Sequence, residues 1–325
     1  MAELRFVDAL KKALGDEMRA DARVIVMGED VGDLGGVFTV TRGLLEEFGP
    51  ERLMDSPLAE ASLAGFALGA ATEGMRPVVE IMFSDFVTIA MDQIVNHAAK
   101  IRYMSNGQFD APIVFRLPGG AGTNHGPQHS QALESWFANV PGLVVAMPSC
   151  PNDGYWMLRH AIQIDDPVIF LENKGMYFGA AEEVSDTPPD DPWAAVIRMP
   201  GSDVTLVSAG RMVGRCLEAA RAAAASGISC EVVDVRYLWP LDVESILASV
   251  ERTSRLLVVT EAVEFSGWGA EVVSRVAQDG FTYLDAPIRR LGAARVPIPV
   301  GLTMEDVIVP SAAAIEREIL ECMAF

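Results

Sequence analysis

The sequence predicts an α/β protein of two domains, each a mainly parallel sheet flanked by helices. The chain has 325 residues, half of them apolar, which is enough to bury two cores. Strand-like and helix-like segments alternate in the first half, as they do in βα units. The alternation resumes after an acidic, proline-rich stretch without periodicity. We therefore expect domains at 1–180 and 201–325, joined by a linker at 181–200.

The first domain begins with an expected helix at 6–21 and the strand VIVMG at 24–28. A run of small residues at 61–71 predicts a second helix, and RPVVEIMF, rich in branched residues, predicts a buried strand. Apolar residues at intervals of three and four then predict an amphipathic helix, capped by Ser84 or Asp85. They are Phe83, Val87, Ala90, Ile94, Ala98 and Ile101.

The remaining elements continue this alternation. Strands are expected in PIVFRL at 112–117, in LVVAMPS at 143–149 and in VIFLE, which follows a helix at about 152–164. In the second domain, DVTLVSAG, SCEVVDV and RLLVVTE predict strands, and a helix ends near Gly227, a residue suited to a C-cap. No cluster of titratable residues is evident in this domain, so we expect it to serve in dimerisation and docking.

Composition excludes several classes of partner. The formal net charge of −20 argues against nucleic acid and anionic membranes. There is no apolar run of membrane-spanning length and no Arg-rich leader, so we expect a soluble, cytoplasmic protein. The four cysteines are too widely spaced for a metal motif, and we expect buried free thiols.

A glycine-rich loop, GEDVGDLGGVF, follows the first expected strand. It does not fit a phosphate cradle, because no Lys-Ser or Lys-Thr pair follows and because Glu29, Asp30 and Asp33 would repel a phosphate.

Glu60 is the first candidate site residue. It stands between the Ser56-Pro57 turn and the small-residue helix, where a carboxylate ordinarily complements the helix dipole. The adjoining βα unit, however, places a cleft at the C-terminal end of its strand, where α/β sheets bind ligands. The spacing alone therefore leaves two roles open for Glu60, that of a helix cap and that of a catalytic residue.

Several motifs carry a family resemblance that covers Val24 to about Pro310. DSPLAE, EIMFSDF, DQIVNHAAKIRYMSNGQ and GPQHSQALESWFANVPGLVVAMPSCPND occur in order. The chain resembles the beta subunits of thiamine-diphosphate-dependent 2-oxo acid dehydrogenases, including those for pyruvate, branched-chain substrates and acetoin. The resemblance implies a transketolase-like pyrimidine-binding domain followed by a transketolase C-terminal domain. It also implies that Glu60 bonds the aminopyrimidine ring of the cofactor.

The same resemblance assigns further residues. Its HSQ motif makes His129 a catalytic candidate, although a lone loop histidine is more often a solvated side chain. Phe86 matches the aromatic residue that stacks on the aminopyrimidine, and it would otherwise be a core residue. Leu58 would contact the ring. Met82 stands where many dehydrogenase relatives have Gln, a feature shared with the acetoin branch.

Half of the cofactor site is missing from the chain. The family holds magnesium and the diphosphate through a Gly-Asp-Gly motif, which this sequence lacks. The resemblance therefore implies an alpha subunit that holds most of the Mg²⁺ site, in an α2β2 enzyme that decarboxylates a 2-oxo acid and acylates a lipoyl arm. Acetoin cleavage, a transketolase-type half and a non-catalytic scaffold are the alternatives.

Two further features depart from the family. The family often binds potassium on a pattern like A-I-x-D-x-N, but this chain has Ile164 in place of the acid within Ala161 to Asp166, so no metal is assigned. The C-terminal domains also dock a basic domain of the lipoyl acyltransferase core. Arg295 stands about where relatives have Asp, which predicts an atypical core, unless Arg295 is only a solvated surface charge.

Overall fold

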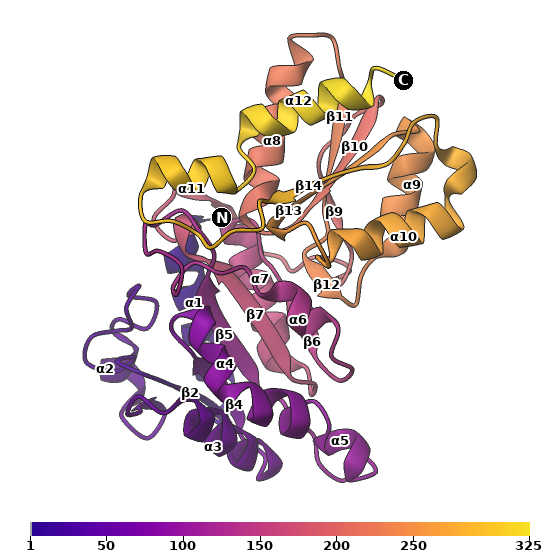
Figure 1. The fold of residues 1–325 in the computed structure, drawn as a ribbon. Coiled ribbons are helices and arrows are strands. Elements are labelled where there is room, and N and C mark those ends of the chain that lie inside the picture. Colours follow the sequence, from indigo (N-terminus) through magenta and orange to yellow (C-terminus); the bar gives the residue numbers. More distant parts are fainter. Residues whose placement is uncertain (1) are drawn as a thin grey trace. The chain divides into compact units, whose positions relative to one another are not determined.

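The computed structural model describes residues 2–325 and divides into two compact units (Figure 1). The first unit comprises residues 1–120 and 136–192, and the second comprises 121–135 and 193–325. The segment 121–135, which carries His129, therefore belongs by its contacts to the second unit. Both units are α/β, as the sequence predicts.

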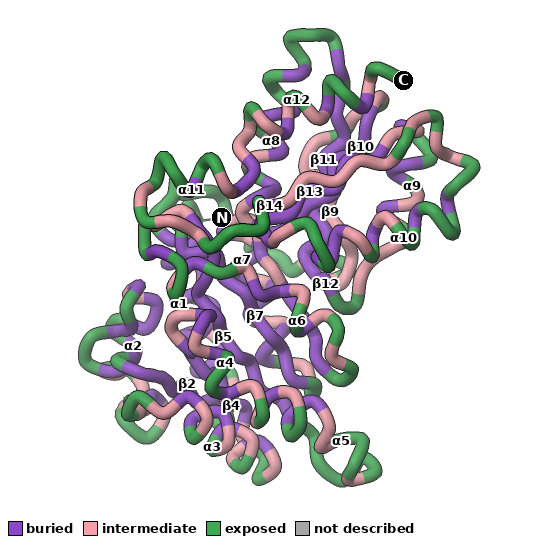
Figure 2. Tube along the Cα trace, in the orientation of Figure 1, coloured by how far each residue is buried: buried purple, intermediate pink, exposed green. Residues whose placement is uncertain are grey.

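The first unit is a parallel sheet with strand order β6-β7-β5-β4-β2-β3. Its strands are fully buried except at β3, because helices cover the sheet (Figure 2). The strands are β2 (Val24–Gly28), β3 (Leu53–Asp55), β4 (Arg76–Glu80), β5 (Val114–Gly119), β6 (Val144–Ala146) and β7 (Val168–Asn173). An antiparallel pair, β1 (Ala2–Leu4) and β8 (Glu182–Val184), lies apart from this sheet.

The helices of this unit follow the predicted order. They are α1 (Phe6–Ala20), α2 (Leu44–Phe48), α3 (Glu60–Thr72), α4 (Val87–Met91), α5 (Ile101–Met104), α6 (Glu134–Ala138) and α7 (Pro151–Gln163), with short 3₁₀ turns η1 (Ser84–Phe86) and η3 (Lys174–Met176). Helices α1 and α7 pack against each other, and α3 packs against α4 and β4. The small residues of α3 allow close packing, because a Cβ at Gly65 would lie 3.3 Å from Oε1 of Gln93.

Two local predictions for this unit are wrong. The strand expected to reach Phe83 ends at Glu80, and the expected long helix is η1, α4, a π-helical segment η2 (Asp92–Ala98) and α5. The predicted caps Ser84 and Asp85 lie inside η1, and the residue at the N-cap is Phe83. The amide of Ala99 donates to the carbonyl of Ile94 at 2.9 Å, five residues back. An apolar pattern does not register that extra residue, since π-bulges keep the same face buried.

The second unit is a sheet with strand order β14-β13-β10-β11-β9, parallel except for β9. Its elements are β9 (Val196–Met199), β10 (Val204–Ser208), α8 (Arg211–Ala224), β11 (Cys230–Asp234), β12 (Tyr237–Trp239), α9 (Val243–Thr253), β13 (Leu256–Val263), α10 (Gly269–Asp279), η4 (Phe281–Tyr283), β14 (Arg289–Ala293), α11 (Leu302–Ile308) and α12 (Ala312–Cys322). The stretch 181–200, predicted to be a linker or edge segment, contributes the strands β8 and β9.

The predicted buried thiols are present in this second unit. Cys216, Cys230 and Cys322 are buried and free. Burial raises the pKa of the Cys216 and Cys230 thiols to about 12 and that of Cys322 to about 11. These thiols are therefore unreactive core residues. Among residues 2–325, no helix is long and apolar enough to cross a membrane.

Candidate functional site

Glu60 opens α3, directly after the turn that follows β3. Its side chain is only 7% exposed, and the N-cap position is taken by Ala59. The helix dipole favours a negative charge at this position. Glu60 is thus a buried carboxylate at the C-terminal edge of the parallel sheet, where ligands bind in this class of fold.

A second buried acid, Glu29, follows the neighbouring strand β2. It is 4% exposed, and neither carboxylate oxygen has a hydrogen-bond partner among residues 2–325. Burial and, to a lesser extent, the nearby charge of Glu60 raise the pKa of Glu29 to about 7, while the neighbouring backbone N–H of Ala59 opposes the rise. Glu29 therefore titrates near neutrality beside Glu60.

A buried charge network joins three further strands at the same edge. The guanidinium of Arg116 in β5 donates to both oxygens of Glu172 in β7, each at 2.7 Å, and to Glu80 in β4. The hydroxyl of Tyr177 also donates to Glu172. Burial raises the pKa of Glu80, and the Arg116 charge opposes that rise. The network holds the strand ends together, and each acid in it already has a partner.

The apolar residues predicted to contact a cofactor follow β4 and β3. Met82 and Phe86 are half-buried around η1, whereas Leu58 is 83% exposed in the turn before α3. The ring of Phe83 lies edge-on to Phe38, with centroids 5.8 Å apart, and under the Lys174 ammonium. Phe83 is therefore held within the unit, while Leu58 presents an apolar surface to solvent.

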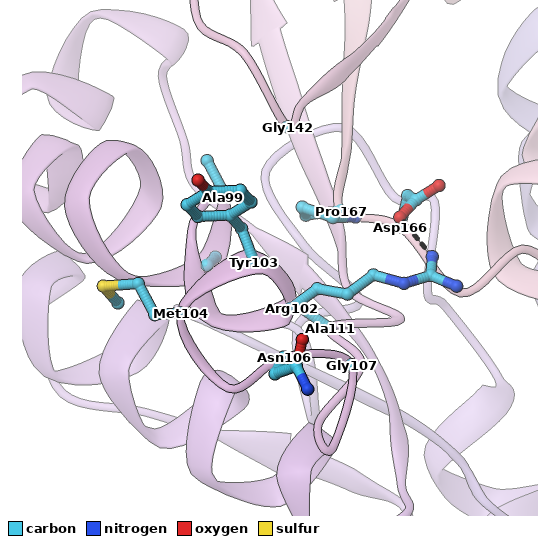
Figure 3. Close-up of a pocket in the computed structure, with 11 residues that line it drawn as sticks. Ala99, Arg102, Tyr103, Met104, Asn106, Gly107, Ala111, Gly142, Asp166 and Pro167 are labelled. Carbon is cyan, nitrogen blue, oxygen red and sulfur yellow. Dashed lines mark hydrogen bonds and ion pairs between the residues drawn. The ribbon is translucent and has the colours of Figure 1, made fainter.

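Three cavities open on the first unit. The first, of about 250 Å³, adjoins the turn before Glu60 and is lined by Met27, Met54, Asp55, Ser56, Pro57, Ala59, Ser62, Leu63 and Phe66. The second, of about 690 Å³, lies around α5, where Arg102 pairs with Asp166 at 2.7 Å (Figure 3). The third, of about 340 Å³, lies beside Arg76 and Asp165. None of the predicted site residues lines any of the three, and only the first is next to one of them in the chain.

The turn after α7 is the position of the family's potassium site. The guanidinium of Arg76 donates to the carbonyl oxygens of Ile162, Gln163 and Ile164 and to the carboxylate of Asp165. The positively charged side chain of Arg76 thus already bonds to these oxygens. We assign no metal to the turn.

The structure places the two predicted catalytic residues in different units. Glu60 lies in the first unit, and the half-buried His129 lies in the segment 121–135 of the second. The sequence did not mark the buried acids of the second unit. Glu134, Glu261 and Glu305 are all buried there. It gave Glu29 at most a supporting position near the cofactor, and the pairing of β2 with β3 brings Glu29 near Glu60.

The first unit fits the aminopyrimidine half of a thiamine diphosphate site. The carboxylate of Glu60 is buried there, and neither oxygen of the buried Glu29 has a hydrogen-bond partner among residues 2–325, so polar atoms of a ring could bond to these acids. Within residues 2–325 there is no group of three or more His, Cys, Asp or Glu side chains placed to hold a metal ion.

Two family models together match most of the chain. Residues 2–179 match the transketolase pyrimidine-binding domain, and residues 194–315 match the transketolase C-terminal domain. Among solved structures, the chain resembles a split-gene transketolase described as an inactive beta4 tetramer. The TM-score is 0.81, with 21% identity and 99% of both chains covered, so this likeness concerns the fold.

Curated relatives are similar over nearly the whole of this chain. The chain is 45% identical over 319 residues to the Arabidopsis thaliana mitochondrial pyruvate dehydrogenase E1 component subunit beta-1, covering 97% of this chain and 88% of the relative. It is 41% identical over 330 residues to the 2-oxoisovalerate dehydrogenase subunit beta of Bacillus subtilis, covering 100% of both.

Proposed function

Since the chain belongs to the family of 2-oxo acid dehydrogenase E1 beta subunits, built from transketolase-type domains, we propose that it is the beta half of a thiamine-diphosphate-dependent dehydrogenase. The enzyme would oxidatively decarboxylate a 2-oxo acid of the pyruvate or branched-chain type and pass the acyl group to a lipoyl arm. The observation that carries the proposal is the buried carboxylate of Glu60 at the start of α3.

The residues of this chain would hold and orient the cofactor ring. When bound, thiamine diphosphate supplies the electron sink that decarboxylation of a 2-oxo acid requires. Glu60 would pair with the aminopyrimidine nitrogen, Phe86 would stack on the ring, and Leu58 and Met82 would contact it. Glu29, with a pKa raised to about 7, would be partly protonated beside Glu60 at neutral pH. His129 would act on the reacting substrate or acyl group.

We propose that an alpha subunit supplies the Mg²⁺ and diphosphate half of the site, in an α2β2 assembly. The absence of a Gly-Asp-Gly motif from the sequence supports this division. So does the apolar surface beside Glu60, where Leu58 and Phe66 are both largely exposed. Exposed apolar residues next to a buried acid suit a protein partner that completes the site.

The second unit would dock the lipoyl acyltransferase core. Arg295 is exposed, with its guanidinium 5.1 Å from the ring centroid of Phe265, and the C-terminal Phe325 is also exposed. A cation at this surface favours a core whose binding domain is not the usual basic type. The cytoplasmic location remains part of the proposal, supported by the buried free thiols.

The test is Glu60→Gln in the complex assembled with its alpha chain. We expect decarboxylation, followed with an artificial electron acceptor, to fall by orders of magnitude, because a neutral amide cannot stabilise the protonated ring nitrogen. Glu73→Gln, the same change at the exposed C-cap of α3, serves as the control and should retain activity. Full activity of Glu60→Gln would contradict the assignment and favour a capping role or a non-catalytic scaffold.

Acetoin cleavage is the second candidate, and Met82 is the residue that favours it. A panel of pyruvate, 3-methyl-2-oxobutanoate and acetoin would distinguish the two functions. Turnover of acetoin well above that of both 2-oxo acids would replace the main proposal with acetoin cleavage.

A further inference from the structure

Two buried carboxylates of the second unit hold the start of the segment that carries His129. The carboxylate of Glu305, in the first turn of α11, accepts the backbone N–H of Gly122 at 2.7 Å and that of Asn124 at 3.0 Å, one on each oxygen. Glu261, in β13, accepts the N–H of Ala121 at 2.7 Å. Glu305 is only 2% exposed, so its charge is compensated mainly by these amides.

Further bonds fix the same segment at both ends. The side-chain oxygen of Asn124 accepts the N–H of Gly301, and the guanidinium of Arg211 donates to the carbonyl of Ala121 at 3.0 Å. At the far end, the hydroxyl of Ser135 accepts the N–H of Trp268 at 3.0 Å. The segment is therefore tied to α8, α11 and the end of β13, all within one unit.

The backbone between the amides that bind Glu305 and His129 is also held in place. The two residues whose amides bind Glu305 both have positive φ, +108° at Gly122 and +61° at Asn124. Such backbone conformations are uncommon and persist when the surrounding structure stabilises them. Gly126 has φ +73°, and its carbonyl accepts the N–H of His129 at 3.3 Å. A Cβ at Gly126 would lie 2.9 Å from the side chain of Val300, just before α11. The path of the backbone up to His129 is thus set against α11.

We propose that Glu305 is a positioning residue that acts through His129: its carboxylate fixes the 121–129 backbone and thereby the location of the imidazole. This inference rests on the catalytic role of His129 in the proposed function. Holding a catalytic group in one place before substrate binds lowers the entropy lost in the transition state. Without the carboxylate, two partly buried N–H groups lose their acceptors, which loosens the segment.

We call the two bonds from Glu305 to the amides of Gly122 and Asn124 the clamp. Amide hydrogen exchange tests the clamp without a measurement of activity. In the assembled complex, Glu305→Gln should accelerate amide exchange at Gly122 and Asn124 by about tenfold or more, because an amide side chain offers only one acceptor oxygen. Asp306→Asn is the matched control, since Asp306 is the neighbouring acid and pairs instead with Arg215 at 2.6 Å. Unchanged protection in Glu305→Gln would overturn the clamp. If that variant does not assemble, Glu305→Asp, which keeps the charge on a shorter arm, replaces it.

A double-mutant cycle then tests the action through His129. Glu305→Gln should lower kcat about tenfold with KM changed less than about twofold, and it should cost nothing further in a His129→Ala background. If the two losses multiply, or if Glu305→Gln is fully active while His129→Ala is not, the positioning role is overturned and the proposed function stands. If His129→Ala is itself fully active, the catalytic assignment of His129 fails and the positioning role fails with it.

Discussion

At the scale of single residues, two buried acids lie at the candidate site, and one of them, Glu29, has a raised pKa. Glu60 and Glu29 follow adjacent parallel strands, and both are buried. Two carboxylates in proximity disfavour double ionisation, and burial assigns the raised pKa of about 7 to Glu29. A neutral Glu29 can donate a hydrogen bond that an ionised one cannot.

Glu29→Gln tests this difference directly. Gln imitates the neutral acid, so we expect turnover at pH 6 within a fewfold of wild type. As pH rises through about 7, wild type gains a second negative charge beside Glu60 and the variant does not. In the assembled complex, kcat of wild type should therefore change as pH passes through about 7, and kcat of the variant should not show that change. Identical profiles for both proteins would show that Glu29 does not titrate there.

Glu134 gives a prediction about stability. Burial and the nearby charge of Glu261 raise its pKa to about 7, against 4.5 for the free side chain. Between these values the folded state binds more protons than the unfolded state, so the free energy of unfolding falls as pH rises from about 4.5 to 7 and then levels off. The full decrease in the free energy of unfolding over this pH range is roughly 3 kcal/mol.

Glu134→Gln removes this titration. The variant should therefore gain stability relative to wild type between pH 5 and pH 8, measured as the denaturation midpoint at each pH. Glu218→Gln, an exposed acid on α8, is the control and should leave the pH dependence unchanged. A difference between wild type and Glu134→Gln that stays constant across this range would contradict the raised pKa.

At the scale of secondary-structure elements, the buried network of Arg116 explains how the strand ends are fixed. One guanidinium serves Glu80 and Glu172 and so joins β4, β5 and β7. Arg116→Met would leave two buried carboxylates without their cation. Removing one partner of a buried ion pair costs about 3 to 5 kcal/mol.

We therefore expect Arg116→Met to lower the thermal midpoint strongly. Arg102→Met, which breaks the exposed pair with Asp166, should cost at most about 1 kcal/mol. Equal, small effects of the two changes would show that the network contributes little to the stability of the sheet.

The local pattern of the sequence was sufficient to predict most helices and strands. Several of the features that it did not predict depend on contacts between residues far apart in the chain. Strand β2 was predicted to the residue, and α1, α3 and α7 to within a residue at each end, because apolar periodicity marks α1 and α7 and a run of small residues marks α3. The π-helical segment was missed because it buries the same face as an α-helix. The clamp by Glu305 joins residues more than 180 positions apart, and no local signal marks such a pair.

At the scale of the whole molecule, the partners give two predictions. The first concerns Arg295. We expect the assembled complex to bind a pyruvate-type peripheral binding domain poorly, and Arg295→Asp to improve capture, because a cation facing a basic domain opposes docking. A pull-down with wild type and variant side by side is the measurement. Equal, tight capture of both would identify Arg295 as a solvated surface charge.

The central claim is that this chain provides half of a cofactor site, and calorimetric titration with thiamine diphosphate and Mg²⁺ tests it most directly. The chain alone should bind weakly or not at all, since the proposal assigns to it only the ring contacts of Glu60 and Phe86 and assigns the diphosphate site to the alpha chain. The complex assembled with its alpha chain should bind in the micromolar range, and Glu60→Gln should weaken that binding. Micromolar binding by this chain alone, with no gain on assembly, would contradict the claim.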